Sequence, residues 1–285
     1  MSCKARMVLV FVLPVLFCVA PVGASAQSTG SHELTLIHPE DEAFDSLLTQ
    51  NFRGFQDLED YRAVLPFMVL LRNDTSHSAT AYAISWDIQS SGGMVNRLVI
   101  EFIQKHHEPK TQIRAFAPGD IRLISPIFNL SPTQYLSQRN ALSQKLAVFS
   151  PLPPYSSTDI KSIKATVDAA IYDDGAYAGL DRFKLLREYQ CTRDAERDVA
   201  ESVLKLKGSE APVSEIVASL ERDAQAGLNA NTSRGERDAI YALHRGEEAQ
   251  ALLNLYRRRG LDSLMARALA TTQHPRENIS PVSPD

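Results

Sequence analysis

The pattern of apolar and polar residues first changes near residue 27. The chain opens with Lys4 and Arg6, continues as an almost unbroken apolar run over 7–20, and reaches Ala24-Ser25-Ala26. A basic start, a short apolar stretch and a small-x-small site are typical of a cleaved secretory signal peptide. We therefore expect residues 1–26 to be a signal peptide and the mature protein to be secreted or periplasmic.

Two alternatives exist for this segment. An uncleaved membrane anchor needs about 20 predominantly apolar residues, whereas this run is shorter and contains Pro14. Lipid attachment at Cys18 requires a small residue before the cysteine, and Phe17 is large. Cleavage after Ala26 is therefore favoured, with no membrane insertion afterwards.

Residues 33–179 have the pattern of a β-rich domain. Thr80–Ile88 alternates with period two, which places Tyr82, Ile84 and Trp86 on one face and small or polar side chains on the other. This pattern predicts a half-buried strand. Several short strands separated by turns, with no helices between them, predict an antiparallel sandwich. Further strands are expected over 64–72, 96–104, 111–116, 120–125 and 160–172, and 142–149 fits either a strand or a helix.

Residues 180–271 have apolar positions at helical spacing, so we expect a helical region there. Gly260 interrupts the last helical pattern. The segment 272–285 is rich in proline and lacks periodicity, which predicts a disordered tail. Helices are expected over 181–207, 213–228, 236–259 and 261–270, with a short one at 40–50 that Asp41 caps.

Charge and cysteine content narrow the picture. The net charge is −4, and removal of the leader, which holds two basic residues and no acid, makes it −6. A mildly acidic protein has no general attraction for nucleic acid, so we expect no nucleic-acid partner. Of the three cysteines, Cys3 and Cys18 lie in the leader, so only Cys191 remains. The mature chain then has no internal disulfide, and we interpret Cys191 as a small buried residue on a helix.

The candidate chemistry lies in an acidic segment. Asp173-Asp174-Gly175 follows a predicted strand, and Asp181 follows shortly after. Asp173, Asp174 and Asp181 are candidate metal ligands, since gathered carboxylates bind Ca²⁺, and paired acids also serve general acid–base catalysis. The interpretation we favour is structural: Asp-Gly forms a hairpin turn and Asp181 caps the first helix. No catalytic residue and no cofactor is assigned.

Two other groups are conceivable binding sites. His106-His107 is flanked by acidic residues, but adjacent side chains on a strand point to opposite faces and cannot share one metal ion without a bulge. Trp86, the only tryptophan, would serve a carbohydrate-binding module if exposed. Its phase with Tyr82 and Ile84 favours a place in the core.

Two segments carry a resemblance. Phe67–Ile88, with Asn73-Asp-Thr-Ser76 followed by Tyr82 and Trp86, looks like the first paired strands of immunoglobulin-like modules in exported bacterial proteins. Ala169–Asp181 looks like the strand ending of uncharacterised exported bacterial proteins that have a helical tail. The resemblance implies an α+β fold: an immunoglobulin-like antiparallel β-sandwich followed by three to four helices. It implies no activity, and the usual inter-sheet disulfide is absent.

These observations lead to one hypothesis and two alternatives. We expect an exported, non-catalytic binding, scaffold or envelope-associated protein, whose partner is an envelope protein or an extracellular polymer. The first alternative is an exported hydrolase that uses Asp173, Asp174 or Asp181, with or without a metal. The second is a carbohydrate-binding module. Convergence of the three carboxylates on a cleft would support the hydrolase, and exposed Trp86 and Tyr82 would support the carbohydrate-binding module.

Overall fold

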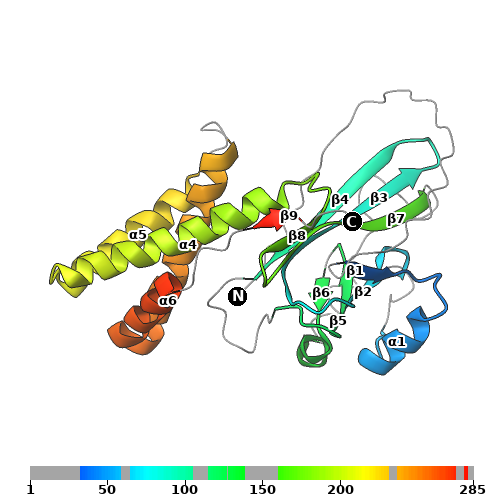
Figure 1. Ribbon diagram of the computed structural model, residues 1–285, viewed down its shortest axis with the longest axis horizontal. Coiled ribbons are helices and arrows are strands. Elements are labelled where there is room, and N and C mark those ends of the chain that lie inside the picture. The colour runs from blue at the N-terminus through cyan, green and yellow to red at the C-terminus, as the bar shows by residue number, and fades with distance from the viewer. Residues whose placement is uncertain are drawn as a thin grey trace. The chain divides into compact units, whose positions relative to one another are not determined.

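The chain forms an α+β structure of two compact units, of which the first is rich in strands and the second is helical (Figure 1). The first unit extends along the chain to Phe183, and the chain from Ile279 onward belongs to it as well. The predicted signal peptide and the expectations for 106–107 and 142–149 lie outside the described residues. This computed structural model describes residues 33–58, 65–104, 115–126, 128–138, 160–230, 236–273 and 279–281.

Two sheets make up the first unit. The four-stranded sheet has the order β1-β2-β5-β6 and is antiparallel throughout. The five-stranded sheet has the order β4-β3-β7-β8-β9 and is antiparallel except for the β8–β9 pair. The strands are β1 Leu34–Ile37, β2 Val69–Asn73, β3 Ala79–Ser90, β4 Val95–Ile103, β5 Ile121–Ser125, β6 Phe128–Leu130, β7 Ile160–Tyr172, β8 Ala176–Gly179 and β9 Ser280–Pro281.

The two sheets share one apolar core. Its largest members, Trp86 and Tyr82 of β3, are fully buried, and Tyr82 stacks on Phe102 of β4 with ring centroids 5.0 Å apart. Asn129 Nδ2 of β6 donates a hydrogen bond of 2.8 Å to the Tyr82 hydroxyl, so a polar contact also joins the sheets. The predicted inward direction of Tyr82, Ile84 and Trp86 is confirmed.

A second core covers the other face of the four-stranded sheet. Helix α1 (Phe44–Asn51) buries Phe44 and Leu48 there, together with Tyr135 of the helical residues 132–138. Asp41 does not cap α1, because the capping position belongs to Ala43, and the Asp41 side chain instead accepts a hydrogen bond from the His38 N–H. The four-stranded sheet is thus buried on both faces.

The expected half-buried character of β3 is wrong. Ala81, Ala83 and Ser85 are buried as fully as the large residues of the opposite face. Both faces of β3 are therefore covered along this stretch. Alternation of large and small residues does not mean alternation of buried and exposed ones here, since small side chains suit a closely packed second face.

Three helices form the second unit: α4 (Leu185–Gly208), α5 (Val213–Leu228) and α6 (Glu236–Gln273). The bounds of α5 are those predicted. The predicted break at Gly260 is confirmed, because Gly260 has φ 81° and ψ −177° and kinks α6. Gly227 and Gly246 let α5 and α6 touch, since a Cβ on Gly227 would lie 2.5 Å from Gly246 Cα. None of the described helices combines the length and apolar character needed to cross a membrane.

The start of α4 and the tail differ from expectation. Helix α4 begins at Leu185 rather than at 181, after Lys184 with a left-handed φ of 61°, so Asp181 does not cap it. Within the tail, Thr272–Gln273 completes α6, and Ser280–Pro281 pairs with β8 as β9.

Candidate functional site

Two of the three sequence-derived candidates lie in one tight turn. Asp173 and Asp174 fill the connection from β7 to β8 together with Gly175. Gly175 has φ 81°, a conformation that glycine adopts without strain, as a three-residue hairpin turn requires. The Asp174 carboxylate accepts a hydrogen bond of 2.9 Å from the Ala176 N–H. The hairpin interpretation of Asp-Gly is therefore confirmed.

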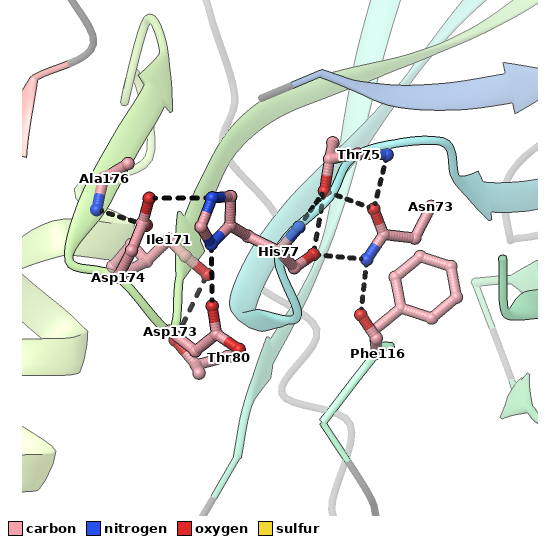
Figure 2. A network of polar contacts seen from close by, with 9 residues as sticks. All are labelled: Asn73, Thr75, His77, Thr80, Phe116, Ile171, Asp173, Asp174 and Ala176. Carbon is pink, nitrogen blue, oxygen red and sulfur yellow. Dashed lines mark hydrogen bonds and ion pairs between the residues drawn. The ribbon is translucent and has the colours of Figure 1, made fainter. Parts of the chain in front are cut away.

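A histidine from another connection meets these two carboxylates (Figure 2). His77 lies between β2 and β3, with Nδ1 3.3 Å from Asp173 Oδ1 and Nε2 3.4 Å from Asp174 Oδ2. One nitrogen of His77 and one oxygen of each aspartate lie within 4.8 Å of one another. The side chains are 36%, 48% and 31% exposed, in the order His77, Asp173 and Asp174, so solvent reaches the cluster.

A buried amide fixes the backbone that carries His77. Asn73, fully buried at the end of β2, donates through Nδ2 to the carbonyl oxygens of His77 (2.8 Å) and Phe116 (2.6 Å). Its Oδ1 accepts a hydrogen bond of 3.0 Å from the Thr75 N–H. Thr75 Oγ1 in turn accepts a hydrogen bond from the His77 N–H. The turn is therefore held by its own buried polar groups, as Figure 2 shows.

The two connections are also joined through backbone and side-chain bonds near the cluster. The Asp173 N–H donates to the Ser78 carbonyl oxygen at 2.9 Å. Thr80 Oγ1 donates to the Ile171 carbonyl oxygen at 3.1 Å. These bonds hold the cluster at a fixed place where β2, β3, β7 and β8 meet their turns.

Asp181 does not join this cluster. It follows β8, whereas Asp173 and Asp174 precede it, so β8 separates them. Burial raises the pKa of Tyr177 to about 12, and the negative charges of Asp181 and Asp168 add to this increase. The Asp181 N–H also donates to the Asp168 carbonyl oxygen at 3.4 Å, so Asp181 lies at the far end of β8.

An ion pair between the buried Asp168 and the partly exposed Arg182 organises that far end. The Asp168 side chain is fully buried and accepts hydrogen bonds from Arg182 Nε (2.5 Å) and the Phe183 N–H (3.2 Å). Its carbonyl oxygen accepts a bond from the Leu180 N–H. These contacts fasten the segment that ends the first unit, and the pairing explains how a carboxylate is accommodated in the interior.

The other candidates lie apart from the cluster. Trp86 and Tyr82 are buried in the core, and Cys191 is buried on α4, as expected. His106 and His107 lie outside the described residues.

The helical unit contains a second histidine held by carboxylates. His244 Nε2 lies 2.7 Å from Glu188 of α4, and Nδ1 lies 3.3 Å from Glu247. Burial alone would lower the pKa of His244, but the hydrogen bonds with Glu188 and Glu247 outweigh it and raise the pKa to about 9. His244 is therefore a charged link between α4 and α6 at neutral pH.

Sequence reasoning missed His77. The residue stands alone in a polar turn, and 96 positions separate it from Asp173. The sequence signal that could have revealed His77 was a pair of turns, one before the predicted strand β3 and one after the predicted strand β7. Only the antiparallel pairing of β3 with β7, in the register Ala79 to Tyr172, brings these turns together.

Comparison with protein-family models, curated proteins and solved structures finds no match to this chain. The functional argument therefore rests on the geometry of the cluster formed by His77, Asp173 and Asp174.

Proposed function

We propose that this chain is an exported, non-catalytic binding protein and that His77, Asp173 and Asp174 form its site for a divalent transition-metal ion. The observation that carries the proposal is the meeting of one imidazole and two carboxylates from two separate turns. Imidazole nitrogen and carboxylate oxygen are the ligands that Zn²⁺ and related ions take in proteins.

The dimensions of the cluster suit such an ion. Two ligands about 2.1 Å from a tetrahedral metal lie roughly 3.4 Å apart. His77 Nδ1 lies 3.3 Å from Asp173 and Nε2 lies 3.4 Å from Asp174, and one donor atom from each of the three residues lies within 4.8 Å of the others. One ring nitrogen would bind, and a small rotation would bring in the second carboxylate. The partly exposed side chains leave further coordination positions to water or to a ligand. Because His77 replaces Asp181 as the third ligand, a transition metal is favoured over Ca²⁺.

The order of the strands supports an immunoglobulin-like sandwich as the framework of this site. In that fold the order A-B-E forms one sheet and C′-C-F-G the other. The orders β1-β2-β5 and β4-β3-β7-β8 correspond to these. The extra strand β6 and the second core beneath α1 depart from the pattern.

The same correspondence favours a binding role for the cluster. The turns after β2 and after β7 take the places of the B–C and F–G loops, which form one end of the sandwich and bind ligands in variable domains. His77 lies in the first turn, and Asp173 and Asp174 in the second. This reasoning is a fold-level analogy, so the chemistry of the three side chains carries the proposal.

The two alternatives receive less support. Convergence of all three carboxylates on a cleft would support the hydrolase alternative, and β8 separates Asp181 from Asp173 and Asp174. The carbohydrate-binding alternative needs exposed aromatic side chains, and Trp86 and Tyr82 are both fully buried.

Titration calorimetry tests the metal site. The mature chain, purified without a polyhistidine tag, is titrated with Zn²⁺ and with Ca²⁺ at pH 7.5. We expect one Zn²⁺ per chain and weaker Ca²⁺ binding. The variant His77→Ala and the double variant Asp173→Asn/Asp174→Asn should each weaken Zn²⁺ binding by about tenfold or more.

Asp181→Asn is the matched control, because it removes a carboxylate of the sequence-derived cluster that lies outside the site. It should bind Zn²⁺ as the unmodified chain does. Equal Zn²⁺ affinity for His77→Ala and the unmodified chain would refute the proposed site.

A further inference from the structure

The end of the chain returns to the β-rich unit. After α6 of the helical unit, Ser280–Pro281 pairs in parallel with β8, with Ser280 opposite Ala176 and Pro281 opposite Tyr177. The Ser280 N–H donates a hydrogen bond of 3.0 Å to the carbonyl oxygen of Gly175. The outer edge of β8 is thus an acceptor for an extended strand, and the C-terminal segment fits it.

This pairing is short and exposed. Both residues of β9 are exposed to solvent. Pro281 has no N–H, so it donates no hydrogen bond to the ladder. The register covers Ala176 and Tyr177 and leaves Ala178 and Gly179 of β8 without a partner in β9.

The connection between β8 and β9 is a long crossover. A parallel pair requires a crossover, and here the crossover contains the whole helical unit, from Lys184 onward. A pairing of only two residues, one of them a proline, is weak within one chain, so a segment from another molecule at high concentration can compete with it.

We propose that the outer edge of β8 is a strand-docking site for the C-terminal segment of a second copy of this chain. Exchange of this segment between two molecules keeps the Ala176–Ser280 register and the bond to Gly175, so the pairing that forms within one chain forms equally between two chains. The main-chain recognition is that of strand addition to a sheet edge. The proposal is independent of metal binding.

One substitution in the full mature chain tests whether the segment around Ser280 can pair with the edge of β8. Ser280→Pro removes the N–H that bonds Gly175, whereas Ser280→Ala keeps it and is the matched control. Sedimentation velocity is measured over roughly 1 to 500 µM, a range that reaches high concentration because the two-residue pairing is weak. We expect the unmodified chain and Ser280→Ala to form a dimer at the highest concentrations, and Ser280→Pro to remain monomeric.

A labelled peptide of residues 274–285 tests the edge directly by fluorescence anisotropy. It should bind the Ser280→Pro chain about tenfold more tightly than the unmodified chain, whose own segment competes. The same peptide carrying Ser280→Pro should not bind. Unchanged Trp86 fluorescence verifies that the variants are folded.

Three results would overturn the inference. The first is failure of the native peptide to bind the Ser280→Pro chain. The second is equal binding of the native peptide and its proline form. The third is an unmodified chain that stays monomeric at the highest concentration, which would exclude a second copy as the occupant.

Discussion

At the scale of residues, polar side chains removed from solvent stabilise each of the two units internally. Asn73 bonds two carbonyl oxygens beneath the His77 turn, and His244 joins Glu188 to Glu247 in the helical unit. Buried groups of this kind stabilise only while every partner is present, because an unsatisfied donor or a lone charge in the interior is costly. For His244, the contribution should therefore depend on protonation.

His244 should make the helical unit sensitive to alkaline pH. Its pKa of about 9 in the folded protein exceeds the ordinary 6.5, so the stabilisation is complete below pH 6.5 and is lost as the pH rises through 9. We expect the free energy of unfolding to fall by roughly 2–3 kcal/mol between pH 6.5 and 9. Urea unfolding followed by far-ultraviolet circular dichroism measures this change.

The variant His244→Gln is the control for this prediction. It has no titrating group at the position, so its stability should change much less over the same range. Burial and Asp198 raise the pKa of Tyr241 above its ordinary 10, so the tyrosine stays protonated through pH 9. An equally steep loss of stability in His244→Gln would show that another group is responsible.

At the scale of elements, the helices depend on one close crossing. Gly227 of α5 and Gly246 of α6 have no room for a side chain, because a Cβ on either would lie 2.5 Å from the Cα of the other. The atoms in contact are backbone atoms on both helices, and backbone cannot shift aside as easily as the end of a flexible side chain. The separation of α5 from α6 is therefore set by these two glycines.

Gly246→Ala should destabilise the helical unit by roughly 1–3 kcal/mol, since the helices must move apart to accept the methyl group. Gly208→Ala is the matched control. Gly208 also lies in a helix, but a Cβ there would meet nothing within 4 Å. It should be neutral or slightly stabilising through helix propensity. Similar urea midpoints for the two variants would contradict the crossing argument.

Element by element, sequence periodicity predicted the local structure well and the assembly poorly. The bounds of β7 and α5 agree with those expected, and the break at Gly260 is where the glycine indicated. These features depend on neighbours along the chain. The order of the strands, the covered second face of β3 and the pairing of β9 depend on distant residues, so no local pattern contains them.

The candidate site also combines residues that a local sequence pattern predicts with a residue that only the fold brings in. Asp173 and Asp174 stood out because Asp-Gly marks a turn. Asp181 was grouped with them only because it is close in sequence, and β8 carries it away. His77 carried no local signal, and its place in the site follows from the pairing of β3 with β7.

At the scale of the whole molecule, the division into two units has a consequence for unfolding. Among the described residues, the cores do not cross between units: the β-rich unit contains the core centred on Trp86 and Tyr82 and the second core beneath α1, and the helical unit contains the core of α4, α5 and α6. Trp86 is the only tryptophan, so its fluorescence reports the β-rich unit alone. Far-ultraviolet circular dichroism reports mainly the helices.

We expect unfolding to give two transitions that these probes separate. Gly246→Ala should move the dichroism midpoint and leave the fluorescence midpoint in place. Asn73→Asp, which turns the buried donor of two bonds into an acceptor, should lower the fluorescence midpoint, with roughly 3 kcal/mol of lost stability. Coincident shifts of both probes in both variants would show one cooperative unit instead.

The central place of β3 affects the order in which the chain acquires its structure. Its first partner, β4, follows at once, but on its other side Ser85 meets Thr166, which lies 81 residues later. As the chain is synthesised from its N-terminus, the β3 edge of the β3–β4 hairpin stays unpaired until β7 is available. Open edges recruit other chains. The exposed β3 edge is therefore an aggregation hazard only during a brief interval in the life of each new chain, which ends when β7 pairs with β3.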